Sequence, residues 1–426
     1  MDNRTLRLDG DQRTVLCAFS ALDVRTGYTH LGPCMKIDKR NISHWLLLLR
    51  QGFFTLLAIF SRYLTSAPEK PVIVLYGHQL SGNLKALYEE WNRHYKNEWD
   101  CFFLSLDPTY GPQLASAGIN VLRCGKLADM LSVGRASAMI TDHGLHAMSP
   151  LIRFTTICFI DVWHGIPYKG FTQQNFRVQR TYSETWVSSP LLEKIYVNQF
   201  GFSAERVKAL GYARTDKLFR RDFPSTDVRA HLQIPAKHKI ILYAPTWQQD
   251  DNGRELFPFG ESQDTFLEAL NTVCATQGAT LLVRSHLNAR ISQKTYTHIA
   301  YCSMQDFADT EDLLLQTDIL ICDWSSIAFD FLALDRPTLF LDVSPPFRNG
   351  FSLGPEYRFG KIAKRLSTTC SFLQEVLNNE DVYSNEQNEI HRRIKSAVYG
   401  ENTDGNAARR QLEHLCELIR SDPNKA

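Results

Sequence analysis

The stretch VIVLYGHQLSGNLKALYEEWNR, residues 72–93, sets the pattern from which the fold of the chain is predicted. Residues 72–76 form an apolar, β-branched run typical of a buried strand, and residues 77–82 contain the glycines of a turn. The spacing of Leu84, Leu87 and Trp91 then places three apolar side chains on one face of a helix. A strand followed by a helix predicts βαβ units and a parallel sheet.

The same alternation continues along the chain in two series. In the first series, further strands are expected at residues 101–106, 121–122, 138–141, 155–162 and 185–188. In the second series, strands are expected at 239–243, 280–283, 319–322 and 338–341, with helices at 266–276 and 325–334. Residues 222–238 contain two prolines and separate the series. We therefore expect an α/β fold with two Rossmann-like domains facing across a cleft.

The length of 426 residues suits two domains with flanking segments. The expected parts are an N-terminal segment, 1–69, an acceptor domain, 70–225, a nucleotide-donor domain, 238–395, and a C-terminal helix, 396–426. Residues 45–60 are apolar but are interrupted by Arg50 and Gln51, and a membrane-spanning helix needs about 20 apolar residues. Two interpretations stay open for 45–60: a helix packed on the N-terminal domain, or one lying on a membrane surface.

Composition excludes several classes of protein. The formal net charge of +1 gives no broad basic surface, so nucleic acid is not an expected partner. None of the ten cysteines forms a C-x-x-C pair, and Cys158 and Cys322 lie in apolar runs. Reduced thiols in a cytoplasmic protein are the expectation. Residues 1–13 are polar, so no secretory signal is predicted.

Polar residues follow several predicted strands directly, at the sheet edge where open α/β folds bind ligands. They are His164, Thr246, Arg284, His286, Asp323, Ser325 and Ser326. Paired serine hydroxyls at a helix start suit a phosphate, although Asp323 and Ser325 also suit plain capping. Arginine and histidine suit an anion, although a capped loop would contain them too. His164 precedes a glycine and a proline in a turn, which suits either a reactive or a structural histidine.

Several common motifs are absent from the sequence. There is no G-x-G-x-x-G fingerprint, no P-loop and no G-x-S-x-G elbow. The spacing of His143 and His146 suits a metal, but no carboxylate or cysteine cluster completes a site. No metal ligand set is therefore predicted.

The motifs together resemble one family. They are W-H-G-I-P at 163–167, Y-A-P-T-W at 243–247, R-S-H at 284–286 and D-W-S-S at 323–326. In this order, and over about residues 70 to 420, the chain resembles the CDP-glycerol glycerophosphotransferases of the teichoic-acid primase and polymerase type, which have a GT-B fold. Two departures are Ile166, where the family usually has threonine, and Leu287, where proline often follows the histidine.

The resemblance implies transfer of glycerol phosphate from CDP-glycerol to an acceptor hydroxyl, with release of CMP and with no metal or other cofactor. His164 would be the general base, and His286 would stabilise the leaving phosphate. Donor or phosphate contacts are implied for Thr246, Arg284, Asp323, Ser325 and Ser326. Supporting roles are implied for Trp163, Gly165, Pro167, Lys169, Arg214 and Asp216.

The expected partners are a nucleotide-activated polyol phosphate and a glycan or lipid-linked acceptor in teichoic-acid or capsular polymer synthesis. The expected location is the cytoplasmic face of the cell membrane, as a peripheral protein. Alternatives are a CDP-ribitol or nucleotide-sugar transferase on the same fold, and a non-catalytic nucleotide-binding protein. The presence of both His164 and His286 argues against the last alternative.

Overall fold

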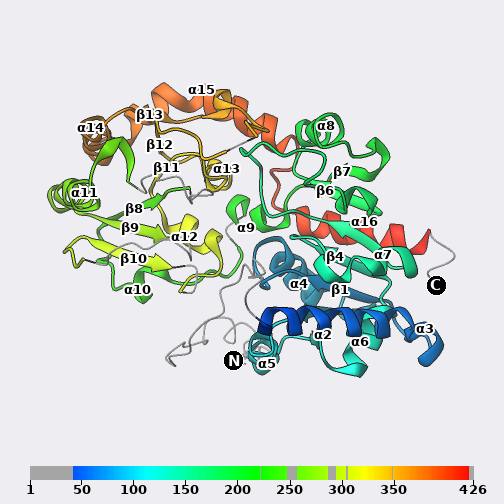
Figure 1. Ribbon diagram of the computed structural model, residues 1–426. Helices are drawn as coiled ribbons and strands as arrows, with labels where there is room; N and C mark the ends of the chain where they lie inside the picture. The colour runs from blue at the N-terminus through cyan, green and yellow to red at the C-terminus, as the bar shows by residue number, and fades with distance from the viewer. Residues whose placement is uncertain are drawn as a thin grey trace, which may run out of the picture. The chain divides into compact units, whose positions relative to one another are not determined.

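The computed structural model describes residues 42–220, 222–246, 257–285, 294–303, 306–347 and 349–421. Its strands form two parallel sheets (Figure 1). The first sheet contains β1 (Val72–Tyr76), β2 (Asp100–Ser105), β3 (Val121–Arg123), β4 (Ala138–Thr141), β5 (Cys158–Asp161), β6 (Glu184–Val187) and β7 (Val207–Ala209). The second contains β8 (Lys239–Ala244), β9 (Ala279–Ser285), β10 (Ile299–Ser303), β11 (Ile319–Cys322), β12 (Thr338–Leu341) and β13 (Lys361–Ala363).

Both sheets have the strand order of a Rossmann-like fold. The first runs β3-β2-β1-β4-β5-β6-β7 and the second β10-β9-β8-β11-β12-β13. The strand order therefore reverses between β1 and β4, and again between β8 and β11. Ligands of open α/β sheets bind at the carboxyl ends of strands at such a switch point. The predicted α/β class with two Rossmann-like sheets is confirmed.

Helices alternate with the strands. Those of the first half are α2 (Ile42–Ile59), α3 (Ser61–Leu64), α4 (Gly82–His94), α5 (Tyr110–Ser116), α6 (Leu127–Gly134), α7 (Pro150–Phe154), α8 (Pro190–Asn198), α9 (Asp216–Phe219) and α10 (Val228–His231). Those of the second half are α11 (Gln263–Gln277), α12 (Thr310–Gln316), α13 (Ile327–Leu332), α14 (Leu366–Asn378), α15 (Glu380–Tyr399) and α16 (Ala407–Arg420). Within the described ranges, no helix is both long and apolar enough to cross a membrane.

The strands predicted from apolar runs are present, with ends that differ by a few residues. Strands β7, β10 and β13 were not predicted, because they are short or partly exposed and lack a continuous apolar run. The expected single helix at 396–426 is wrong. The chain leaves α15 at Gly400, whose φ of 57° few residues other than glycine adopt, and α16 begins only at Ala407.

By its contacts the chain forms two compact units. The described part of the first unit is residues 42–80, 88–160 and 416–421, and the second unit is residues 81–87 and 161–415. The division does not fall at residues 222–238, where the sequence predicted a domain boundary. The reason is packing: Tyr168, Phe176 and Tyr212 share one buried core with Ile240 and Leu320 of the second sheet. The predicted site residues that the structure describes all belong to the second unit.

Candidate functional site

The switch point of the second sheet brings together two predicted site residues. Thr246 follows β8 and Asp323 follows β11, and these strands are neighbours. Oδ1 of Asp323 accepts hydrogen bonds from the backbone N–H of Thr246 (2.8 Å) and of Trp324 (2.6 Å), and also from the Thr246 hydroxyl. The Asp323 side chain is buried. One carboxylate therefore fixes the loops that follow the two central strands.

Ser325 and Ser326 lie between β11 and α13, beside that carboxylate. Ser326 immediately precedes the helix and makes no side-chain capping hydrogen bond. The hydroxyl of Ser325 is 3.5 Å from the N–H of Ile327, the limit of a hydrogen bond. Both serines are partly exposed. Capping therefore accounts poorly for these hydroxyls, and both can donate to a ligand.

Arg284 is the last residue but one of β9, the strand next to β8. Its guanidinium is buried, and Nη2 donates to the carbonyl of Phe307 (3.1 Å) and to the hydroxyl of Thr310 (2.9 Å). Burial lowers the pKa of Arg284. Among the residues that the structure describes, Nη1 has no hydrogen-bond partner. The phosphate contact of Arg284 stays a prediction, and His286 lies outside the described residues.

The predicted base, His164, lies in a tightly constrained turn after β5. Trp163 has a φ of 41° and Gly165 a φ of 150°, both in the region that favours glycine. The His164 side chain is exposed, and its ring lies against that of Trp163, with centroids 4.2 Å apart. Trp163 in turn packs on Phe171 and Phe176. The turn therefore presents an accessible imidazole that packs on a cluster of aromatic rings.

Arg214 fixes the backbone of this turn by hydrogen bonds. Its Nη1 donates to the carbonyl of His164 at 2.7 Å, and its Nη2 lies 2.8 and 2.6 Å from the two carboxylate oxygens of Asp330 on α13. The backbone N–H of Arg214 donates to Asn83, whose side-chain amide donates to the carbonyl of Trp163 at 2.8 Å. A buried charge pair and an amide thus fix the backbone on both sides of the base.

The charge of Arg214 is well supported. Burial alone would lower its pKa, but the carboxylates of Asp330 and Glu311 outweigh burial and raise the pKa of Arg214 above its ordinary value. The nearest approach of Arg214 to Glu311 is 4.0 Å. The guanidinium therefore stays charged beside the turn.

At Gly165 the turn that contains His164 contacts the segment that contains Ser326. A Cβ at Gly165 would lie 2.8 Å from Nη2 of Arg214 and 3.5 Å from Oγ of Ser326. The positive φ of Gly165 disfavours any other residue as well. The turn that contains His164 and the start of the segment that contains Ser326 are therefore in close contact within one unit.

Pro167 and Lys169 continue the turn into a backbone pairing. Pro167 is buried, and Lys169 forms an antiparallel bridge with Phe351. The carbonyl of Lys169 accepts a hydrogen bond from the Ser352 hydroxyl at 2.7 Å. The ammonium of Lys169 lies 5.4 Å from the centre of the Phe171 ring. This pairing supports the predicted supporting role of the segment.

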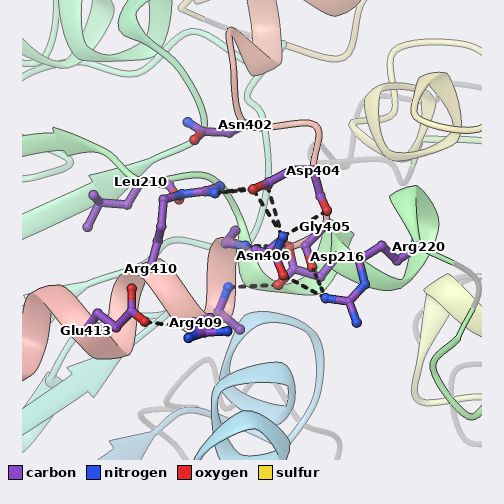
Figure 2. A network of polar contacts seen from close by, with 12 residues as sticks. Leu210, Asp216, Arg220, Asn402, Asp404, Gly405, Asn406, Arg409, Arg410 and Glu413 are labelled. Carbon is purple, nitrogen blue, oxygen red and sulfur yellow. Dashed lines mark hydrogen bonds and ion pairs between the residues drawn. The ribbon is translucent and has the colours of Figure 1, made fainter.

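Asp216, for which the resemblance implied a supporting role, caps a helix. Its two carboxylate oxygens accept the first N–H groups of α16, those of Ala407 and Ala408, at 2.8 Å each. Burial raises the pKa of Asp216 to about 7. Figure 2 shows this cap beside the pair that Arg220 forms with Asn406 (2.7 Å). Asp216 therefore fixes α16 to the chain just after Arg214 rather than facing a ligand.

Two residues of the site were not predicted: Asn83 and Asp330. Asn83 lies in the stretch 72–93 and Asp330 in the expected helix 325–334, but no local pattern shows what they contact. The available signal was a carboxylate within the apolar run Phe329-Asp330-Phe331, since a charge in a buried helix needs a partner. Across the described ranges, no group of three or more histidine, cysteine or acidic side chains has the geometry to hold a metal.

Two Rossmann-like sheets, with polar residues at the carboxyl ends of the central strands, define the class as a GT-B-type transferase. The chain belongs to the family described as CDP-Glycerol:Poly(glycerophosphate) glycerophosphotransferase, which matches residues 61–417. The residues with which the sequence resembled this family lie within the match, so the resemblance is confirmed.

Individual relatives agree with this assignment. The teichoic acid glycerol-phosphate transferase of Staphylococcus aureus is 27% identical, over 66% of this chain and 76% of that protein. The teichoic acid poly(glycerol phosphate) polymerase of Bacillus spizizenii is also 27% identical, over 80% of this chain and 92% of that protein. The solved structure of the wall teichoic acid polymerase TagF matches with a TM-score of 0.69 and 20% identity, over 89% of this chain and 96% of that chain. That likeness supports the fold.

Proposed function

We propose that this chain transfers glycerol phosphate from CDP-glycerol to a hydroxyl of a teichoic-acid-like acceptor, and that His164 is the base of the reaction. The observation that carries the proposal is the contact of the His164 turn with Arg214 and Ser326 at Gly165. It brings the turn that bears an accessible imidazole into contact with a hydroxyl suited to a phosphate oxygen, that of Ser326.

The proposed step is an attack on phosphorus. His164 takes the proton of the acceptor hydroxyl, and the oxygen forms a bond to the phosphorus that bears glycerol. The bond from this phosphorus to the oxygen of CMP breaks, and CMP leaves. Ser325 and Ser326 donate to the phosphate oxygens, where negative charge builds up, and Thr246, whose hydroxyl donates to Asp323, lines the donor site. Arg284 and His286 are proposed to stabilise the leaving phosphate, and these donors replace a metal ion.

A donor panel tests the substrate. We expect the purified protein, given a polyol-phosphate acceptor, to release CMP from CDP-glycerol much faster than from CDP-ribitol, and to release no UDP from UDP-sugars. Nucleotide release is measured for each donor, with a sample lacking acceptor as the control. Release of UDP alone would contradict the proposal, and preference for CDP-ribitol would change the polyol. Absence of any release would favour a non-catalytic role.

The surface of helix α2 suggests how the enzyme reaches its acceptor. Apart from Arg50, its exposed side chains are apolar among those described, whereas Gln51 and Thr55 are buried, the reverse of an ordinary surface helix. The apolar face, as we define it, is exposed by 47 to 68% at Trp45, Leu46, Leu49, Phe53, Leu56 and Phe60. In the same unit α2 packs beside α6 and α7 (Figure 1), on which Leu127 and Phe154 are also exposed.

We propose that this apolar face lies on the cell membrane and gives the enzyme access to a lipid-linked acceptor. Contiguous exposed apolar side chains are uncommon on monomeric proteins unless they bind something. Exposed Lys126 and Arg153 adjoin Leu127 and Phe154, so the rim of the face carries positive charge. An apolar helix face with basic neighbours suits the interface of an anionic bilayer. The chain would thus be a peripheral membrane protein.

Flotation with vesicles tests this face. We expect the protein to float with vesicles that contain phosphatidylglycerol, and Leu49→Glu with Phe53→Glu to reduce the bound fraction at least tenfold, because burying a carboxylate in the interface is costly. Ala275→Glu, at an exposed position of α11, is the matched control. Equal flotation of all three proteins would exclude this face as the site of attachment.

A further inference from the structure

Three histidines gather at the switch point of the first sheet, where the mechanism uses none of them. His78 follows β1, and His143 and His146 follow the neighbouring strand β4. The ring of His78 lies 4.7 Å from that of His143 and 5.6 Å from that of His146, measured between centroids. All three belong to the first unit. They occupy the place where a sheet of this order binds a ligand.

Two of these rings are held in place by neighbours. Nδ1 of His143 lies 2.7 Å from a carboxylate oxygen of Asp142, which is buried. Nδ1 of His146 lies 3.5 Å from the hydroxyl of Tyr76. His78 and His146 are exposed, and His143 is partly exposed. The cluster is therefore an ordered group of imidazoles that a ligand can reach.

The charges of the cluster are unevenly distributed. Burial, then the neighbouring rings, lowers the pKa of His78 to about 4, and burial followed by His143 lowers the pKa of His146. Burial also acts against protonation of His143, but Asp142 outweighs it and raises the pKa of His143. Within the cluster, protonation is therefore favoured at His143, beside Asp142, and disfavoured at His78 and His146.

Helix α2 packs close to this region, and its Arg50 reaches the loop after β3. A Cβ on Gly125 would collide with the guanidinium of Arg50, so this side chain reaches from α2 to the loop after β3. The charge of Arg50 favours the ionised form of Cys124 and so partly opposes the effect of burial on the Cys124 pKa. Cys124 in turn raises the pKa of Tyr76, whose hydroxyl lies near His146. Burial raises the pKa values of Cys124 and Tyr76, so neither adds negative charge at neutral pH. In addition, α2 packs against the short turn that begins at His146.

We propose that His78, His143 and His146 bind a phosphate group of the acceptor. Imidazole N–H groups donate to phosphate oxygens, and a bound phosphate favours the protonated form of each ring. Asp142 is already paired with His143, and no side-chain group in the described residues has a metal-binding geometry, so an anion is favoured over a cation. The identity of the ligand as the acceptor rests on the proposed function, whereas the binding of a phosphate group does not.

Calorimetry on the full chain tests the site without turnover. The probes are inorganic phosphate and glycerol 3-phosphate, each titrated in two buffers with different ionisation enthalpies. We expect binding to take up protons and to weaken as the pH rises from 6 to 8, because neutral imidazoles must be protonated. His78→Gln with His146→Gln should weaken binding roughly a hundredfold, since each of the two charge-assisted hydrogen bonds contributes about one factor of ten. His94→Gln, an exposed histidine of α4, is the control.

The outcomes separate this site from the donor site. Phosphate binding should persist in saturating CDP-glycerol, and the double variant should raise the KM of a phosphate-bearing acceptor while leaving the KM of CDP-glycerol unchanged. Unchanged affinity in the double variant, displacement by CDP-glycerol, or a requirement for Zn²⁺ that EDTA abolishes would each overturn the proposal. If circular dichroism shows that the double variant is unfolded, the phosphate affinity of the single variant His78→Gln tests the proposal. Failure of CDP-glycerol as donor would leave the phosphate result standing.

Discussion

His164→Ala is expected to reduce the turnover of CDP-glycerol by about 10² to 10⁴-fold, the usual contribution of a general base. The substitution removes the group that accepts the proton of the acceptor hydroxyl. It should leave the affinity for CDP-glycerol nearly unchanged, because Thr246, Asp323 and the two serines belong to other strand ends. CMP release gives the turnover, and calorimetry with CDP-glycerol gives the affinity.

The matched control is His94→Ala, which removes an imidazole exposed on α4 and should leave turnover unchanged. Since the His164 ring is exposed, thermal unfolding of the His164 variant should stay close to that of the unmodified protein. If His164→Ala retained near-normal turnover, the base assignment would be wrong. A loss of donor affinity equal to the loss of turnover would instead make His164 a donor-binding residue.

Asp330→Ala is expected to have the largest effect on stability. It leaves the charge of Arg214 buried without its bidentate partner, which costs about 3–5 kcal/mol in comparable buried pairs. It also releases the guanidinium that holds the carbonyl of His164, so the base loses its position. We therefore expect a lower melting temperature together with a lower kcat, both measured on the purified chain.

Two further variants separate position from stability. Asp330→Glu keeps the charge and should recover part of both properties, whereas Glu386→Ala removes only an exposed partner of Lys361 and should cost at most about 1 kcal/mol. If Asp330 has a positioning role, kcat of Asp330→Ala is reduced even at temperatures below the melting temperature of this variant. The KM of CDP-glycerol stays constant. Full kcat in Asp330→Ala at a temperature where it is folded would contradict that role.

Most of the fold could be predicted because its central strands are continuous apolar runs. Strands such as β1, β8 and β11 are buried along their whole length or nearly so, and their sequence shows it directly. Edge strands such as β13 are partly exposed and carry no comparable pattern. The expected domain boundary depended on two prolines, whereas the observed division depends on long-range packing of aromatic side chains.

The site was predictable where it depends on strand ends and not where it depends on long-range partners. Asp323 and Thr246 follow their strands in the sequence, and the strand order then joins them. The partnership of Arg214 with Asp330 spans 116 residues, and the bond from Asn83 to Trp163 spans 80. No local pattern encodes such pairs. Asp216 was placed near the site by its motif, but the structure gives it a helix to cap.

The cap that Asp216 provides also has a consequence for biosynthesis. Its partner Ala407 comes 191 residues later in the chain, and the amide of Gln411 on the same helix donates to the carbonyl of Gly211 at 2.6 Å. The backbone on which Arg214 sits is therefore completed only after α16 has emerged from the ribosome. A nascent or truncated chain that ends before residue 407 contains every proposed catalytic group but lacks this support. Full activity is therefore expected only in a chain long enough to form α16.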